Sequence, residues 1–544
     1  MVATTIMSWS VGFQNALKKQ SITPKYELLF HNLPLGPGGN YRIYGGHEPF
    51  MAQNPKTANL RIKKSGPTVN GCGIIPSRWN VTFGGFDVPV AGNIKGLFPD
   101  IRRGAFASLY CEIDGIKERV AFGQLKQITG VKDDWLFSFI DIVGALATNC
   151  DGGIVSSELT SLNNPIPFGK FFYRAGQTTL TNTTYSMGGN TISVNRLNDF
   201  EKSYAVDGLA KVEIAGHGTA YFEWTTKSAA TGSGTLTLTA GSKGGSVIYP
   251  GSLALTNIPS GSTVTALVRL KGKPWEIIPY ILFSKDGDRS EPFDEYPRSW
   301  STFGNLPVDL WDESDAAVNN SRVQANPSTT AYEWNYTIEE PLSSGFRELT
   351  DLFATVGLWP VWRQNAMSFR CALNPRINGI LPIVKITDDK IIRIESQDLF
   401  SPENPVVYSA LKIIYGSGSL QKYVTGSSAT RAPSLPFEGI YEIDQQFIYD
   451  PSSGTSKSQM ARGDVERIIG WQMNAIETIQ LTVGIEYARL CAGDIVSVTS
   501  DYIFNQTQQP QNGWLRMRAM VVDISYSFST RECNLTLATF YPQW

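Results

Sequence analysis

Histidine and the signatures of common catalytic sites are scarce in this sequence. Only 3 of its 544 residues are histidines, and His31, His47 and His217 are too far apart in the chain to form a metal-binding pair. The chain has no G-x-S-x-G nucleophile elbow, no Walker loop and no G-x-G-x-x-G motif opening a helix after a strand. We therefore expect a protein that is not an enzyme, needs no cofactor and binds no metal.

Long apolar runs and an excess of charge are also absent. The apolar stretch at 135–147 is too short to span a membrane and is interrupted by Asp141, so we expect no membrane helix. The first residues lack the basic start of a secretory signal, which predicts folding in a cytoplasm. The 47 Lys plus Arg and 49 Asp plus Glu are interspersed, which predicts no tight binding of duplex nucleic acid.

Cysteine spacing excludes two further classes of site. The six cysteines are separated by tens of residues, which fits neither CxxC metal pairs nor a dense disulfide framework. We expect buried free thiols at Cys72, Cys111, Cys150, Cys371, Cys491 and Cys533.

The acidic segment 286–296 has part of a calcium-loop pattern. Asp286 and Asp288 match the first two oxygen ligands of an EF-hand, but Glu291 stands where that loop requires glycine. A solvated loop is the interpretation that we prefer.

Glycine, proline and alternating hydrophobic residues are abundant, which predicts a mainly β, multidomain protein. In residues 1–165, Ser10 is placed to cap a short helix. Alternating stretches then meet at Gly84 and Gly85 and again at Asp114 and Gly115, residue pairs that allow tight hairpin turns. This part is predicted to be an antiparallel β-barrel.

Residues 166–270 are rich in Gly, Ser and Thr and are predicted to form an inserted β-sandwich with exposed loops. Tyr221 and Trp224 could stack on a sugar if both faced outward. In a strand, however, Tyr221 lies on the opposite face from Phe222 and Trp224, which favours packing in a core.

The rest of the chain is predicted to form two units. Residues 271–400 are predicted to form a small α+β domain, with a helix at 343–357 followed by a hairpin around 363–366. Residues 401–544 are predicted to form a second β-barrel with a helix near 458–469. Within it, Gly493 and Asp494 form a strand-ending turn, because glycine can take a positive φ and the carboxylate can accept backbone N–H groups.

The order of these pieces resembles the hub protein of bacteriophage tails. The resemblance rests on the capped first helix and strands and on four later segments; it excludes the insertion. Those segments are PWEIIPYILF at 274–283, ELTDLFATVGLWPVWRQNAMSFRCAL at 348–373, NPVVYSALKIIYG at 404–416 and YARLCAGDIVSVTSD at 487–501. The family usually has Pro-Gly-Asp at the final turn, whereas this chain has Ala492 before Gly493 and Asp494.

The resemblance implies a homotrimer in which each chain supplies two tube-like barrels. Three chains would form a pseudo-sixfold ring that adapts the hexameric tail tube or distal tail protein to a central spike or fibre. The partners would include the tape-measure protein, and DNA would pass through the ring during ejection without sequence specificity. The expected location is the virion tail tip or baseplate, assembled in the cytoplasm of a bacterial host.

Two alternatives remain open at this stage. The insertion could contact a neighbouring tail protein or the host surface. The whole chain could instead be a carbohydrate-binding or polysaccharide-degrading β protein of the virion surface, because a pair of catalytic carboxylates cannot be located from sequence alone.

Overall fold

Strands make up most of the residues that the computed structural model describes, as the alternating sequence predicts. The structure describes residues 9–31, 41–44, 60–64, 66–67, 74–75, 78–83, 106–131, 134–141, 177–186, 188–198, 200, 207–216, 218–239, 257–272, 334–338, 358–363, 367–371, 381–398, 408–415, 422–427, 439–445, 476–504 and 513–540.

The first part of the chain forms a short helix and a run of mostly antiparallel strands. The sheet order is β2-β1-β7-β8-β9-β6-β3. The elements are α1 Val11–Leu17, β1 Lys25–His31, β2 Tyr41–Tyr44, β3 Ile62–Lys63, β4 Gly66–Pro67, β5 Ile74–Ile75, β6 Arg78–Phe83, β7 Phe106–Ile113, β8 Ile116–Val131 and β9 Asp134–Ile140.

Helix α1 begins where the sequence predicts. The side chain of Ser10 accepts a hydrogen bond from the backbone N–H of Phe13, which satisfies one of the donors left free at a helix start. Phe13, Ala16 and Leu17 are buried, so the apolar side of the helix faces the core.

In the last part of the chain the strands are hydrogen-bonded one after another, and we call this order the strand path. The strands at its two ends come from a single segment of the chain. The order is β19-β25-β26-β27-β24-β20, with β19 parallel to β25 and the other pairs antiparallel. A three-residue 3-10 helix, η6, joins β19 to β20, so residues 384–398 supply both ends of the path. The elements are β19 Val384–Thr387, η6 Asp388–Lys390, β20 Ile391–Asp398, β24 Ile476–Gly484, η8 Ile485–Arg489, β25 Ile495–Ser500, β26 Trp514–Ser527 and β27 Glu532–Phe540.

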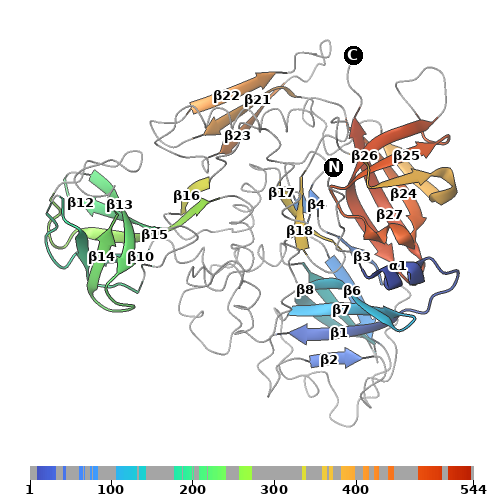
Figure 1. Cartoon of the computed structure of the whole chain (residues 1–544), viewed down its shortest axis with the longest axis horizontal. Helices are drawn as coiled ribbons and strands as arrows, with labels where there is room; N and C mark the ends of the chain where they lie inside the picture. Colours follow the sequence, from blue (N-terminus) through green and yellow to red (C-terminus); the bar gives the residue numbers. More distant parts are fainter. Residues whose placement is uncertain are drawn as a thin grey trace, which may run out of the picture.

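The first and last parts share one sheet and one hydrophobic core. Strand β3 pairs with β6 on one side and with β26 on the other, through Ile62 with Tyr526 and Lys63 with Ser525. Figure 1 shows the blue N-terminal strands directly beside the red C-terminal strands. A single cluster of buried residues runs from Trp9 to Leu537. The two ends of the chain therefore fold against each other.

The insertion, for which a β-sandwich is expected, forms a sheet whose first and last strands meet. Its order is β10-β15-β12-β13-β14-β11, and its two ends meet through a bridge between Thr181 and Val194. Alternation alone predicts an inward and an outward face, but the meeting of first and last strands depends on register. The strands are β10 Gln177–Leu180, β11 Thr191–Val194, β12 Gly208–Ile214, β13 Gly218–Lys227, β14 Gly234–Leu238 and β15 Thr263–Gly272.

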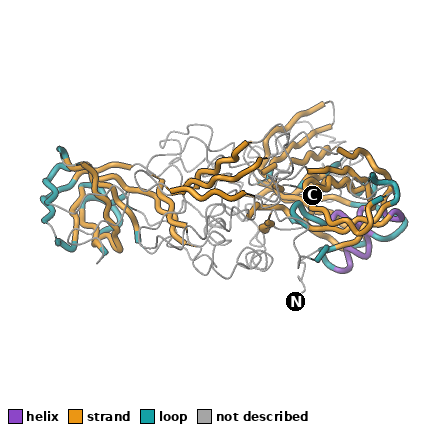
Figure 2. The backbone as a smooth tube through the Cα atoms, turned by 90° about the horizontal axis from the view of Figure 1, so that it is seen from above, coloured by secondary structure: helices purple, strands orange, loops and turns teal. Residues whose placement is uncertain are grey.

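The insertion has its own buried core and lies apart from the joined ends. Its core includes Phe200, Phe222 and Trp224 and shares no residue with the cluster of the first and last parts. Figure 2 shows it at one end of the long axis, with the joined strands at the other end. Strand β15 extends beyond it to pair with β16, Trp334–Ile338.

The middle of the chain contributes two small sheets. The predicted hairpin is present as β17, Leu358–Trp362, antiparallel to β18, Met367–Cys371. A three-stranded sheet has the order β22-β21-β23, from β21 Tyr408–Tyr415, β22 Lys422–Ser427 and β23 Gly439–Gln445. The helices predicted at 343–357 and 458–469 lie outside the described residues. The boundary expected at residue 400 does not follow the sheet, because β19 and β20 pair with β25 and β24.

Candidate functional site

We call the contact between the first and last parts of the chain, where β3 pairs with β26, the joint. Aromatic side chains pack at this joint. Trp9 and Phe13 come from the helix region, Tyr526 lies near the end of β26, and Phe528 directly follows that strand. The ring centres of Trp9 and Tyr526 are 6.0 Å apart, and those of Phe13 and Phe528 are also 6.0 Å apart. Each such pair contributes about 0.5–1.5 kcal/mol beyond its burial. The hydroxyl of Tyr526 also donates to the carbonyl of Val120 at 2.9 Å, so β26 is bonded to β8 as well as to β3.

A fully buried lysine lies at the centre of this joint. The ammonium group of Lys64 donates to the carbonyl oxygens of Ala488 and Leu490, each at 2.7 Å. Its nitrogen is 5.8 Å from the ring centre of Trp9 and 5.5 Å from that of Tyr526, within range of cation–π attraction. Lys64, the residue after β3, therefore links the first part of the chain to the C-terminal end of η8 in the last part.

The charge of Lys64 is set by opposing influences. Burial lowers the pKa of Lys64, because an ammonium ion loses its hydration inside the protein. The nearby Cys491, Cys533 and Asp494 side chains oppose this shift, while Arg363 adds to it. The two carbonyl acceptors favour the ammonium form, since a neutral amine donates more weakly.

The turn after η8 completes the joint. Gly493 has φ +88°, a left-handed value that glycine adopts at little cost. A side-chain oxygen of Asp494 accepts the backbone N–H of Cys491 at 2.8 Å, and Gly493 N–H donates to Val521 at 2.7 Å. The turn directs the chain into β25 and fixes the carbonyl of Leu490 that Lys64 contacts.

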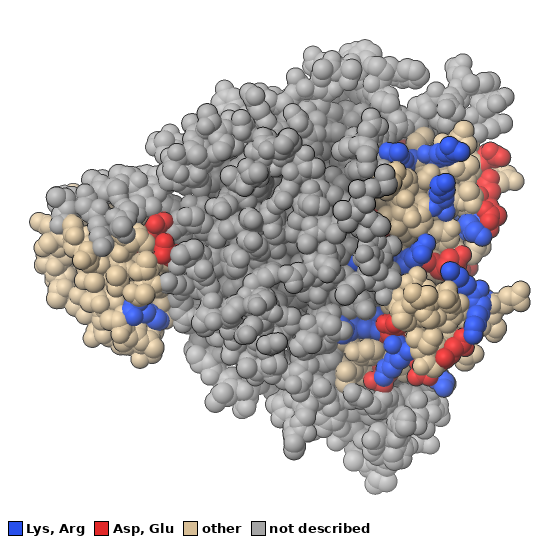
Figure 3. All heavy atoms as spheres, in the orientation of Figure 1, with Lys and Arg blue, Asp and Glu red and all other residues tan. Residues whose placement is uncertain are grey.

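Charged side chains are mixed in sign on the outside of the joined ends. Figure 3 shows Lys and Arg interspersed with Asp and Glu over these strands, whereas the described surface of the insertion has few charges on the same face. Lys63 and Asp523 form an ion pair at 2.7 Å where β3 meets β26. Among the described residues on this face of the joined ends, charges of one sign do not gather into a large field.

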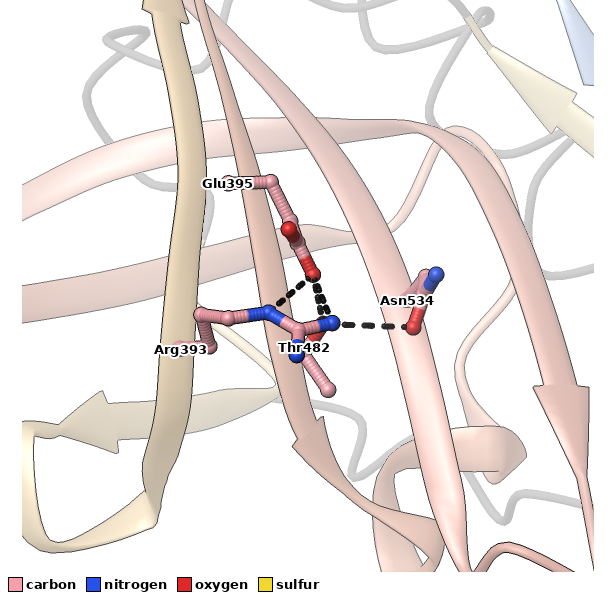
Figure 4. Close-up of polar contacts among 4 residues, drawn as sticks. All are labelled: Arg393, Glu395, Thr482 and Asn534. Atoms are coloured by element: carbon pink, nitrogen blue, oxygen red, sulfur yellow. Dashed lines mark hydrogen bonds and ion pairs between the residues drawn. The ribbon is translucent and has the colours of Figure 1, made fainter.

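A polar network covers the outer face of β20, β24 and β27 (Figure 4). Arg393 donates to Glu395 at 2.7 Å, and the hydroxyl of Thr482 donates to the same carboxylate oxygen at 2.7 Å. Thr482 also lies 3.3 Å from the side-chain oxygen of Asn534. The hydrogen bond from Arg393, and then that from Thr482, lowers the pKa of Glu395. Strand β20 is bulged at this point, so the network stabilises a ladder with irregular backbone pairing.

The residues predicted to form turns or sites lie partly within the described chain. Asp114 and Gly115 form the two-residue turn between β7 and β8, with φ of 53° and 77°. Gly84 and Gly85 lie outside the described residues, as do His47 and His217 and the acidic segment 286–296. His31 is the last residue of β1.

The two aromatic candidates of the insertion are in different environments. Trp224 on β13 is 2% exposed and packs edge-on against Phe200 in the core, so it offers no ring face to a ligand. Tyr221 is half-buried on the opposite face of β13, where its neighbour across the sheet is Lys211. The structure therefore does not bring Tyr221 and Trp224 together as a platform.

The described part of the chain contains no group of three or more His, Cys, Asp or Glu side chains that could hold a metal ion. None of its helices is long and apolar enough to cross a membrane. Cys111, Cys491 and Cys533 are buried free thiols.

No protein-family model and no curated protein sequence matches the chain. Among solved structures, it is similar to the 43 kDa tail protein of prophage MuSo2 from Shewanella oneidensis. The identity is 11%, the TM-score is 0.36, and the match covers 95% of this chain and 98% of that chain. A tail protein from Neisseria meningitidis matches with 10% identity and a TM-score of 0.32, over 94% of this chain and 96% of the other. A type VI secretion component from E. coli has 9% identity and a TM-score of 0.29, over 89% and 74%.

The sequence reasoning missed Lys64 and its contacts. The local pattern contained one signal, since Ile62 and Lys64 share the inward face of an alternating stretch. A lysine on an apolar face usually extends to solvent, so the pattern alone does not predict full burial.

Proposed function

We propose that this chain is a structural, non-enzymatic hub of a phage-like tail tip or baseplate. One observation carries the proposal: β strands from the two ends of the chain stand side by side around a shared core, joined through β3 and β26. The sequence resemblance implies such a pair of β units in each chain. The shared core would keep the two units at a fixed angle, which a ring-forming subunit requires.

The strand path of the last part supports a tube-like unit. Because residues 384–398 supply both ends of the path, these strands form the second barrel of the proposed hub. In the proposed hub, the strands ordered β2-β1-β7-β8-β9-β6-β3 belong to the first tube-like unit. In a homotrimer, six such units would face the six subunits of a tail tube or distal tail protein.

The proposed ring has a passage and two faces. A central spike or fibre would bind the face away from the tube, and the tape-measure protein and then DNA would pass through the centre. The formal net charge of −2 suits a conduit, because a strongly basic lining would retain DNA phosphates. The location would be the virion tail, after assembly in the host cytoplasm.

The insertion supports a separate contact. It has its own core and lies at the far end of the long axis from the joined strands (Figure 2). In the proposed hub it projects outward and contacts a neighbouring tail protein or the host surface.

Light scattering on the purified protein tests the proposal. We expect a mass of three times the 59.9 kDa chain mass, because the hub is proposed to be a trimer. A monomer at every concentration would contradict the trimer. A monomer that also releases sugars from bacterial polysaccharide would favour the carbohydrate-active alternative.

A further inference from the structure

Strand β15 pairs with two different strands in succession. Its first half pairs with β12 inside the insertion. Its second half pairs with β16, which lies off the closed order of the insertion strands. Leu267 is the last residue paired with β12, and the next residue, Val268, is already paired with Ile338 of β16. The backbone ladder therefore leaves the insertion without an unpaired residue in β15.

The insertion holds the first half of β15 on both edges and on both faces. Strands β10 and β12 pair with its two edges over residues 263–266. Val264 and Ala266 are buried in the core of the insertion. Thr265 and Leu267, on the opposite face of the strand, are buried as well. Strand β15 therefore cannot tilt or slide within the insertion without breaking backbone pairs and disturbing that core.

The connection differs physically from a flexible linker between domains. A single chain rich in glycine and serine samples many end-to-end distances, because its backbone is not held by partners. In contrast, residues 268–272 pair with residues 334–338 in continuous register. At about 3.3 Å per residue, this paired length is on the order of 17 Å. A two-stranded ladder is only marginally stable alone, but this one continues a strand that a larger sheet already fixes.

The ladder leads from the insertion toward the rest of the chain. Figure 1 shows β15 leaving the green insertion strands beside β16, with the hairpin of β17 and β18 farther along in the same direction. That hairpin packs on the first part of the chain, because the rings of Trp362 and Phe122 are stacked with their centres 6.2 Å apart. The paired strands thus lie between the insertion and the joined ends.

We propose that residues 268–272 and 334–338 form a strut that holds the insertion at a fixed orientation to the rest of the chain. For its use, the strut rests on the proposed hub function, in which the insertion contacts a neighbouring tail protein or the host surface. The strut would set the direction of that contact. A partner that binds the insertion would then turn the whole subunit with it.

Single-molecule fluorescence energy transfer on the full chain tests the strut. One dye is attached at Asn195 in the insertion and the other at Gln127 in β8, both of which are exposed. Introduced ketone side chains carry the dyes, so the native cysteines stay unlabelled. The width of the transfer-efficiency distribution reports how far the insertion moves relative to the joined ends.

Two insertions of the same length separate the strut from the rest of the insertion. The strut variant has Gly-Ser-Gly-Ser inserted between Leu267 and Val268, where the ladder passes from β12 to β16. The matched control has the same four residues inserted between Ala229 and Ala230, in the exposed turn between β13 and β14. Circular dichroism shows whether each variant is folded.

A second strut variant leaves the sequence of the insertion unchanged. Tyr336→Pro with Thr337→Pro alters two neighbouring residues of β16 that pair with β15. Alternate residues of a strand bond to alternate sides, so one of these two N–H groups is directed at β15, and proline removes it. This variant decides the test if the first strut variant does not fold.

We expect one narrow distribution for the unaltered protein and the control, and a distribution at least about twofold broader for both strut variants. An unaltered protein as broad as the strut variants would overturn the strut, as would strut variants as narrow as the control. Light scattering on the same samples separates the two proposals. A trimer with a broad distribution overturns the strut alone, and a monomer with a narrow distribution contradicts the trimeric hub alone.

Discussion

The ammonium nitrogen of Lys64 lies 2.7 Å from the carbonyl oxygen of Leu490, a residue 426 positions later in the chain. Placing an ammonium ion away from water costs several kcal/mol unless its hydrogen bonds are replaced. The carbonyls of Leu490 and Ala488 replace two of them. Separation of the two ends of the chain would break these bonds and expose the aromatic cluster, so the joint resists opening.

Replacement of Lys64 should weaken the joint. In Lys64→Met the carbonyls of Ala488 and Leu490 lose their donor, and each buried unpaired group costs about 1–3 kcal/mol. Relief from burying the charge offsets part of this cost, and we expect a net loss of about 2 kcal/mol. The measurements are the urea midpoint and the hydrogen exchange of residues 485–494, which should become faster.

The adjacent residue provides the control for this change. Lys63 points outward and pairs with Asp523 at the surface, so Lys63→Met should cost less than about 1 kcal/mol. Equal shifts of the urea midpoint in Lys63→Met and Lys64→Met would contradict the role assigned to Lys64.

The turn at Asp494 should depend on its side-chain oxygen. Asp494→Ala leaves the buried N–H of Cys491 without its acceptor, at a cost of about 1–3 kcal/mol. Asp494→Asn keeps an oxygen in the same place and should retain most of the stability. Thermal unfolding of the two variants checks this, and a similar melting temperature for both would show that the hydrogen bond does not matter.

The buried cysteines should resist alkylation in the folded protein. Burial raises the pKa of the Cys533 thiol to about 12, and burial also raises the pKa of Cys111. The thiolate is the reactive form, and with a pKa near 12 it is on the order of one in a thousand molecules at pH 9. Iodoacetamide followed by mass spectrometry should label Cys111, Cys491 and Cys533 only after unfolding in guanidinium. Rapid labelling of Cys533 in native buffer would contradict the closed joint.

Removal of the insertion should leave the joint intact. Gln177 pairs with Ala266, so the points where the insertion leaves and rejoins the chain lie side by side. A short glycine linker in place of residues 178–265 should therefore preserve the number of subunits in the assembly. Cys533 should also remain protected from alkylation. Infection or attachment of a tail component should be impaired. Loss of self-association would contradict the assignment of the insertion as a separate contact.

The sequence by itself determined the local features of this protein. Ser10 caps α1, and Asp114 with Gly115 turns β7 into β8, because a capping oxygen or a residue that tolerates positive φ acts on its immediate neighbours. Alternation near the end of β26 likewise determined that Ile524 and Tyr526 face the core, with Asp523 and Ser525 on the other side.

Only the tertiary structure decided which distant strands meet. Several contacts depend on the register between remote segments. Residues 384–398 pair with β24 and β25, the ends of the insertion sheet meet through Thr181 and Val194, and Lys64 is buried against Leu490. The physical reason is that a capping or turn preference is set by a few adjacent residues. The pairing of strands hundreds of residues apart is set by the packing of the whole core that they enclose.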